Sequence, residues 1–388
     1  MTQLDGGDDG LIGGIPGPTA AAQTWWIYQG TGRRLDPQER DRRWPEPPHW
    51  RAFHGGPDLP ASPPDDDETD RRLGEPDVAH PVNRREVSMI NAALYLRRPL
   101  LITGRPGSGK STLAFRIARE LGLGRVLHWP IVSRTTLRAG LYEYDPIGRA
   151  QAAGRRWSVA ALLAAGADPA TGTGADRRLG GAAGPGAGGL GLDEGDDVGD
   201  FVTIGPLGTA LLPHRLPRVL LIDEMDKSDI DLPNDLLNVF EEGEFSIPEL
   251  VRVRRRSREV VVHTADPGAT ATIRDGIVRC HEFPIVVITS NGEREFPPAF
   301  LRRCLLLEIP DPDRDRLAAM VAAHFPRGTR GEGLIREFLE RDAQVGLAAD
   351  QLLNAVHLAT SGAFQDSDEH AWPELLDAIW HRLSSSGP

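Results

Sequence analysis

The sequence predicts an α/β fold in which helices flank a parallel sheet, followed by a small all-helical lid. The sheet is indicated by short apolar runs with the length of buried strands, at 99–103, 125–132, 219–222, 284–288 and 305–309. Helical spacing of apolar residues precedes and follows the first of these runs, at 83–98 and 112–121. The lid is indicated by four further helical patterns, at 313–325, 332–342, 349–361 and 372–384.

A glycine-rich loop lies between the strand predicted at 99–103 and the helix predicted at 112–121. It fits the pattern G-x-x-x-x-G-K-[ST] with Gly104, Arg105, Pro106, Gly107, Ser108, Gly109, Lys110 and Ser111, followed by Thr112. The glycines let the backbone turn its N–H groups toward an anion, and the helix N-terminus adds partial positive charge. We therefore expect this loop to bind a nucleoside triphosphate, with Lys110 on the β- and γ-phosphates and the Ser111 hydroxyl on Mg²⁺.

Lysine is almost absent from the chain, which makes the two that remain informative. Of 44 basic residues only Lys110 and Lys227 are lysines, and all others are arginines. An ammonium is a compact point charge, whereas the wide guanidinium fork does not fill the same phosphate cradle. The retention of Lys110 inside the glycine-rich loop supports a working phosphate site.

Acidic residues follow another predicted strand. The apolar run 219–222 ends in Asp223 and Glu224, which places two carboxylates at the carboxyl edge of a parallel sheet, where ligands bind. Adjacent strand residues point to opposite sides, so the two acids can divide the work. We expect Asp223 to hold Mg²⁺ and Glu224 to polarise the attacking water. Asn291, which follows the run 284–288, can hydrogen-bond both the γ-phosphate and that water.

Composition limits the class of protein. A net charge of −12 and a pI near 5.4 argue against a general nucleic-acid or anionic-membrane binder. No apolar run approaches the roughly 18 residues of a membrane helix. The polar N-terminus shows no signal peptide, and Cys280 and Cys304 form no disulfide framework, so we expect reduced thiols and a cytoplasmic location.

The chain divides by composition into three parts. Residues 1–80 are rich in Gly, Pro and Asp and are predicted to be a largely disordered arm, 81–311 the core, and 312–388 the lid. Within the core, 166–200 reads as a flexible Gly/Ala-rich insertion after a short helix at 157–165. The arm nevertheless carries four of the eight tryptophans, Trp25, Trp26, Trp44 and Trp50. They predict docking segments, either for a partner or for the chain's own body.

One basic cluster interrupts this acidic chain. Within 251–279, which alternates like hairpin strands, the cluster consists of Arg252, Arg254, Arg255, Arg256 and Arg258. It could face a pore and touch substrate or nucleic acid. The alternative is a solvated strand face that pairs with acids of a neighbour.

In these motifs the chain resembles the AAA+ ATPases, and among them the MoxR group. The resemblance runs from about residue 80 to the C-terminus and rests on the order of four motifs: 104–111 (Walker A), 220–227 (Walker B and its continuation), 289–291 and 299–304. It implies ATP and Mg²⁺ as ligands, a sheet with the phosphate-loop strand central, and a ring, commonly a hexamer. It also implies that Asn291 is sensor 1 and that Arg303, with Arg302 next in line, reaches the neighbouring subunit's γ-phosphate.

The resemblance has one departure. Many AAA+ lids carry a basic sensor-2 residue early in a lid helix, but no Lys or Arg occurs between Arg341 and Arg382. Coupling of the lid to the nucleotide is therefore missing or uses another residue.

These observations favour an ATP-hydrolysing, chaperone-like remodeler of a client protein, with a partner that carries a von Willebrand A domain, as the resemblance implies. One alternative is a nucleic-acid-associated motor or loader, supported by the arginine cluster and opposed by the net charge. The other is a low-turnover, ATP-dependent switch or scaffold in a defence system that docks partners through the tryptophan-bearing arm.

Overall fold

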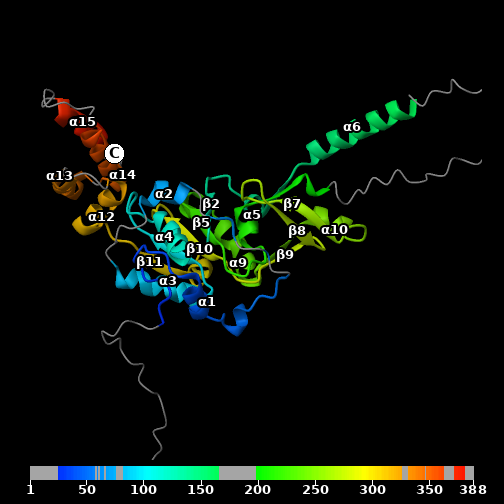
Figure 1. Cartoon of the computed structure of the whole chain (residues 1–388), viewed down its shortest axis with the longest axis horizontal. Coiled ribbons are helices and arrows are strands. Elements are labelled where there is room, and N and C mark those ends of the chain that lie inside the picture. The colour runs from blue at the N-terminus through cyan, green and yellow to red at the C-terminus, as the bar shows by residue number, and fades with distance from the viewer. Residues whose placement is uncertain are drawn as a thin grey trace, which may run out of the picture.

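A computed structural model provides the structure of the chain (Figure 1). It describes residues 25–56, 59, 62–64, 67–75, 82–165, 198–325, 331–345, 347–361 and 371–380. The first 24 residues of the predicted arm and residues 166–197 of the predicted insertion lie outside the described residues.

A five-stranded parallel sheet forms the centre of the molecule. Its strand order is β11-β1-β10-β5-β2, with bounds Leu305–Glu308, Leu100–Thr103, Ile285–Ser290, Val219–Asp223 and Leu127–Pro130. The five apolar runs are thus confirmed as strands of one sheet. The expectation that the phosphate-loop strand is central is wrong, because β10 occupies the middle and β1 lies one place from the edge. All six residues of β10 are buried, as a middle strand requires.

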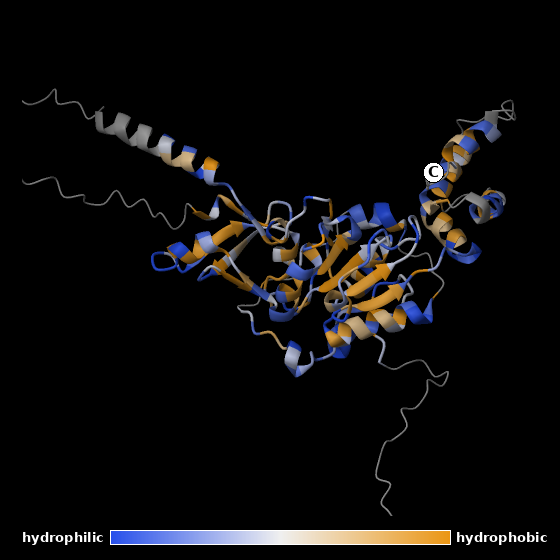
Figure 2. Cartoon of the chain, turned by 180° about the vertical axis from the view of Figure 1, so that it is seen from behind, coloured by the Kyte–Doolittle hydropathy of each residue, from blue (hydrophilic) through white to orange (hydrophobic). Residues whose placement is uncertain are grey.

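Helices cover both faces of this sheet. Side chains on one face, such as Leu100 and Ile102, pack with α3 (Arg84–Leu96) and α4 (Thr112–Leu121). Leu101, between them on β1, contributes to the opposite cluster with α9 (Leu232–Glu242). This alternation follows from the two-residue period of a strand and explains why buried parallel strands are apolar throughout. Figure 2 shows the sheet as an apolar layer between more polar surfaces.

A second sheet of six strands adjoins the first. Its order is β3-β4-β7-β8-β9-β6, with bounds Tyr142–Tyr144, Val202–Ile204, Glu259–His263, Thr270–Arg274, Ile277–Arg279 and Glu244–Ser246. The short helices of this region are α5 (Leu137–Leu141), α8 (Pro206–Ala210) and α10 (Pro248–Val253). Between β5 and α9 lies η2 (Met225–Lys227), and α11 (Pro298–Leu301) lies between β10 and β11.

Two predictions for this region need correction. The alternation expected over 251–279 begins only at β7, because Pro248 starts a helix that carries Arg252, and a turn holds the next three arginines. The helix expected at 157–165 is the end of a 20-residue helix, α6 (Pro146–Ala165), which extends away from the rest of the molecule (Figure 1).

The C-terminal helices form the expected lid. They are α12 (Arg314–His324), α13 (Gly331–Val345), α14 (Ala349–Thr360) and α15 (Ala371–Ile379), and they gather at the end of the molecule opposite the second sheet (Figure 1). The lid has its own apolar cluster, which includes Leu352. In it the rings of Phe338 and Trp380 pack edge to face, with 5.7 Å between their centroids. A separate core lets the lid pack as a unit of its own.

The arm differs from its prediction, because residues 25–56 have defined structure against the core. They include α1 (Pro37–Arg43) and η1 (His49–Arg51), and α2 (Asp67–Leu73) follows. Trp26 and Tyr28 are buried, whereas Trp50 is 68% exposed. A buried Asn91 on α3 explains the docking, since its side chain accepts from the Ile27 and Tyr28 amides and donates to the Tyr28 carbonyl. Such pairing is invisible in composition, on which the disorder prediction depended.

Glu120 on α4 holds the next part of the arm. Its carboxylate accepts hydrogen bonds from the amides of Gln29, Gly30 and Gly32. Burial raises the pKa of this carboxyl group, and the three amides oppose that change. The arm is therefore fixed to the core by main-chain groups that two buried side chains satisfy.

Two smaller expectations can be compared with the described residues. Cys280 and Cys304 are free and buried, and burial raises the pKa of each thiol to about 12. Among the helices that the structure describes, none combines the length and apolarity that a membrane span requires.

Replacing Asn91 with Ala should detach the first part of the arm. The substitution leaves buried main-chain groups of residues 27 and 28 without partners, at a cost of about 2–4 kcal/mol. Urea unfolding would measure this loss, and limited proteolysis would show faster cleavage before residue 40. Ser88→Ala, on the same helix, is the control, and equal behaviour of the two variants would contradict the docking role of Asn91.

Candidate functional site

The glycine-rich loop follows β1 and folds around Lys110. Three glycines of the loop, Gly104, Gly107 and Gly109, have φ values of 153°, 77° and 85°, which residues other than glycine rarely adopt. The Lys110 ammonium donates to the carbonyls of Gly104 and Arg105, each at 2.8 Å. Burial lowers the pKa of Lys110, while the nearby carboxylates of Asp226, Asp223 and Glu224 oppose that shift. The loop and its lysine have the arrangement of a phosphate cradle.

Asp223, at the end of β5, receives hydrogen bonds from three other elements. Its Oδ1 accepts from Ser111 Oγ at 2.7 Å and from Thr289 Oγ1 at 2.6 Å, and its Oδ2 lies 3.3 Å from His128 Nε2. Burial alone would raise the pKa of this carboxyl group, but the bonds from His128, Ser111 and Thr289 prevail and lower it to about 2. The side chain is therefore a carboxylate at neutral pH.

The residues present fit Mg²⁺ and a triphosphate. The Ser111 hydroxyl and the Asp223 carboxylate are the hard oxygen ligands that Mg²⁺ prefers. Inside the loop the buried Ser108 hydroxyl has no hydrogen-bond partner among the described residues, and the same holds for Oδ1 of the buried Asp226. Unsatisfied buried polar atoms of this kind are typical of a site that a ligand completes.

Glu224 directly follows the strand and has an unusual conformation. Its φ of 60° makes it one of three non-glycine residues with positive φ among those described, and its amide donates to Thr289 Oγ1 at 2.8 Å. The side chain is 44% exposed, and its Oε2 lies 2.7 Å from the ammonium of Lys227. The two lysines of the chain thus lie in the same site. Lys110 belongs to the phosphate loop, and Lys227 forms an ion pair with Glu224, the predicted base.

Asn291 follows β10, between the strand of the phosphate loop and the strand of the acids. Its amide donates to Asp226 Oδ2 at 2.9 Å, and the amide of Glu293 donates to the same oxygen at 3.0 Å. The buried Asp226 therefore ties the loop of Asn291 to the turn that follows Glu224.

The lid also reaches the loop. A Cβ placed on Gly107 would lie 2.5 Å from Ala348 Cβ, so the start of α14 packs directly on the loop. A Cβ placed on Gly109 would lie 3.7 Å from a guanidinium nitrogen of Arg316, on α12. Arg105 forms ion pairs with Asp311 at 2.8 Å and with Asp342 on α13 at 3.8 Å.

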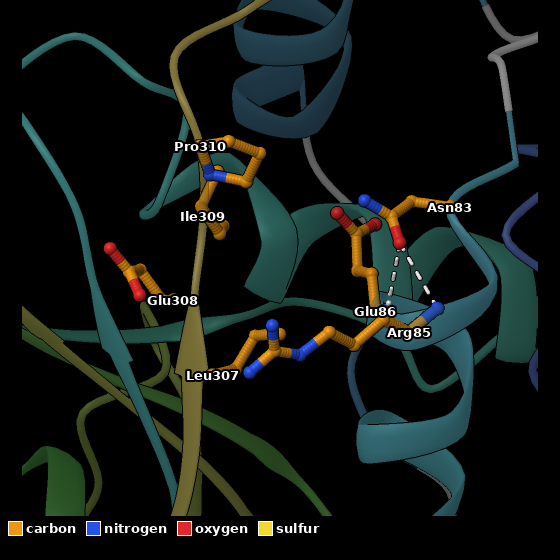
Figure 3. Close-up of a pocket in the computed structure, with 7 residues that line it drawn as sticks. All are labelled: Asn83, Arg85, Glu86, Leu307, Glu308, Ile309 and Pro310. Carbon is orange, nitrogen blue, oxygen red and sulfur yellow. Dashed lines mark hydrogen bonds between the residues drawn. The ribbon is translucent and has the colours of Figure 1, made fainter.

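A cavity of about 390 Å³ adjoins the phosphate loop. It lies between the start of α3 and the end of β11, with Asn83, Glu86, Ile309 and Pro310 among its lining residues (Figure 3). The Ile309 amide donates to the Thr103 carbonyl at 2.8 Å, which places the cavity wall beside the start of the loop.

The two arginines predicted to reach a nucleotide, Arg302 and Arg303, lie at the opposite edge of the sheet from the glycine-rich loop. Leu100 pairs with Leu305 and Thr103 with Glu308, so Arg302 and Arg303 precede β11 at the amino edge, whereas the loop leaves the carboxyl edge. Four strand residues separate the two edges by roughly 13 Å. Arg303 Nε lies 2.6 Å from Glu241 Oε1, and Arg302 is exposed. The structure thus brings together Lys110, Ser111, Asp223, Glu224 and Asn291, and separates Arg302 and Arg303 from them.

Sequence reasoning missed several residues of this site. It assigned no role to His128, Thr289, Asp226 or Arg316. His128 and Thr289 lie on strands near their carboxyl ends, and that position is a usable signal, because polar side chains there face the ligand edge. Arg316 was missed because the search for a lid cation covered only the later lid helices.

Replacing Lys110 with Arg should weaken ATP binding by at least about tenfold, or about 1.4 kcal/mol, despite the conserved charge. The guanidinium is wider than the ammonium that the two loop carbonyls enclose. Titration with a fluorescent ATP analogue measures the effect, with Arg119→Lys on α4 as the control. An unchanged affinity of Lys110→Arg would contradict the importance of shape in this cradle.

Comparison with protein-family models identifies the domain, whereas a search of curated protein sequences gave no match. The family model described as AAA domain (dynein-related subfamily) matches residues 99–304, from β1 and the phosphate loop to the residue before β11. Proteins with this domain are in general nucleotide-hydrolysing ATPases, typically assembled as rings. Since the match covers just over half of the 388 residues, the chain belongs to the AAA family, in the dynein-related subfamily.

Proposed function

We propose that this protein is a MoxR-like AAA+ ATPase that couples ATP hydrolysis to the remodeling of a partner protein. The observation that carries the proposal is the meeting of Lys110, the Ser111–Asp223 pair, Glu224 and Asn291 at one edge of the sheet. Three parallel strands deliver these groups, so their relative positions are set by the core of the fold.

ATP binding would use the loop and the cavity beside it. The loop amides and Lys110 would hold the phosphates, with the ammonium exchanging its two loop carbonyls for phosphate oxygens. The cavity between Asn83 and Ile309 supports a site for the adenine ring, because its lining residue Ile309 hydrogen-bonds Thr103, the residue before Gly104. Ser111 and Asp223 would hold Mg²⁺, which when bound supplies positive charge that neutralises the phosphate oxygens.

Hydrolysis needs a base and a group that orients water. Glu224 would accept the proton of the attacking water, and its exposed carboxylate is accessible for that role. Before that step the carboxylate must leave the ammonium of Lys227, since an oxygen that accepts from Lys227 is less available to water. Asn291 would hold water and the γ-phosphate, with its backbone fixed by Asp226.

The arginine that completes the site would come from a neighbouring subunit. Arg303 and Arg302 lie at the edge of the sheet opposite to their own phosphate loop, so they cannot serve it within one chain. An arrangement in which each amino edge faces the next subunit's phosphate loop would produce a ring, for which we propose six subunits. A trans arginine stabilises the charge that develops on the transferred phosphoryl group.

The protein client and the partner with a von Willebrand A domain are proposed from the MoxR resemblance.

A nucleic-acid motor has one supporting observation, because all five arginines of the cluster are exposed. However, Arg258 forms an ion pair with Asp275 at 2.9 Å within its own hairpin, and the chain carries a net charge of −12. Capture of partners by the ATP-bound Glu224→Gln protein, followed by mass spectrometry, would separate a protein client from a nucleic acid.

Replacing Glu224 with Gln should lower kcat by at least roughly 100-fold while ATP still binds, because the amide cannot accept the water proton. Phosphate release measures turnover, and a fluorescent ATP analogue measures binding. Glu242→Gln, on the exposed end of α9, is the control. Normal turnover of the Glu224→Gln protein would refute the assignment of the base.

Replacing Arg316 with Ala should weaken ATP binding by about tenfold, since this lid cation is the one that lies beside Gly109 among the described residues. Arg314→Ala, two residues earlier on the exposed side of α12, should bind normally. Isothermal titration of both variants makes the comparison. Equal affinities would show that the lid acts on the nucleotide without Arg316.

A further inference from the structure

The second half of the arm is fixed to the core near the amino edge of the sheet. The Gly55 amide donates to the Cys280 carbonyl at 2.9 Å, and the rings of Phe53 and Phe283 stack at 5.7 Å. A Cβ on Gly55 would lie 2.0 Å from the Arg279 carbonyl oxygen, so the contact requires glycine. The short turn η1 delivers Arg51 into this contact, with that residue only 5% exposed.

The Arg51 guanidinium has three kinds of partner there. It donates to the carbonyl of Phe240 in the last turn of α9 and lies 5.6 Å from the centre of the Phe283 ring. Its Nη2 lies 3.6 Å from Glu241 Oε2. A cation is favoured at a helix C-terminus, over an aromatic ring and beside a carboxylate, and Arg51 has all three contacts. Arg51 is therefore a rigid group, unlike most surface arginines.

Glu241 joins this arm residue to the predicted trans arginine. One carboxylate oxygen contacts Arg51, and the other accepts from Arg303 Nε at 2.6 Å. Arg303 also donates to the Ala299 carbonyl at 3.2 Å, and its side chain remains 35% exposed. Arm, α9 and the arginine before β11 thus form one chain of contacts.

Two further arginines lie close enough to act on the charge of Arg51. Burial lowers the pKa of Arg51, Glu241 opposes that change, and the charges of Arg98 and Arg303 lower it further. Glu241 is therefore the carboxylate that stabilises the charged form of Arg51 against these two like charges.

We propose that Arg51 and Glu241 are positioning residues for Arg303, so that the docked arm sets the trans arginine for the neighbouring subunit. The inference rests on the proposed function and adds a role for the arm within it. An exposed ion pair between Glu241 and Arg303 alone would be weak and would leave both side chains free to change rotamer. The buried Arg51 holds the second carboxylate oxygen, which reduces the entropy that Arg303 loses when it is fixed.

Mixed assemblies of the full chain test this role. Glu224→Gln subunits keep Arg303 but cannot hydrolyse ATP, and Arg303→Ala subunits keep Glu224 but cannot help a neighbour. Each should be nearly inactive alone, and an equal mixture should hydrolyse ATP, because one subunit donates the arginine and the other accepts it. An inactive mixture would overturn the trans arginine and this inference together.

Adding Arg51→Met to one kind of subunit then gives the decisive comparison. In the donor Glu224→Gln subunit it should lower the kcat of the mixture about fivefold with little change in KM, the effect of losing about 1 kcal/mol of positioning. In the acceptor Arg303→Ala subunit it should leave the rate unchanged. Arg51→Lys in the donor should restore part of the rate, and Arg42→Met, an exposed arm arginine, should have no effect.

The asymmetry separates positioning from a loss of folding. A general destabilisation by Arg51→Met would lower the rate equally from either kind of subunit, and that result would overturn the inference. An active mixture that is indifferent to Arg51→Met in the donor would also overturn it, while leaving the trans arginine in place. Glu241→Gln in the donor should reproduce the effect of Arg51→Met.

Discussion

The carboxylate of Asp223 is the group on which the arrangement of the site depends. It accepts from Ser111 of the phosphate loop, from Thr289 on β10, and contacts His128 on β2. These contacts join the carboxyl ends of strands that are far apart in sequence. Because each donor stabilises the charged form, the carboxylate can remain ionised although it is largely buried. Thr289 also accepts from the Glu224 amide, so the same network sets the proposed base, Glu224, beside the proposed metal ligand, Asp223.

The lid and the sheet meet at the glycine-rich loop. This contact explains how nucleotide binding could change the position of the lid although the later lid helices lack the basic sensor-2 residue. Ala348 packs on Gly107, Arg316 lies beside Gly109, and Arg105 pairs with Asp311 and Asp342. Any change in the loop conformation must therefore alter contacts of three lid segments. The lid keeps its own apolar cluster around Phe338 and can respond as a unit.

The arm is fixed to the core by buried hydrogen bonds, and its second half lies near the amino edge of the sheet, opposite to the glycine-rich loop. Asn91 and Glu120 satisfy its main chain, and Arg51 enters a contact with the end of α9. The glycine-rich loop and Arg303 thus lie at opposite edges of the sheet. Under the proposed function Arg303 would serve the phosphate loop of a neighbouring subunit, which is the physical reason to expect function in an assembly.

The sequence alone determined the five strands of the parallel sheet, the phosphate loop, the two acids and the lid helices, because each depends on local patterns of apolar and polar residues. It could not order the strands, so the middle place of β10 was missed. Composition also hid the docked arm, since Asn91 and Arg51 act through buried partners distant in sequence. The same holds for Arg316, whose place beside Gly109 results from the packing of the lid. Residue type and spacing specified the chemistry, and tertiary packing decided which groups share an edge.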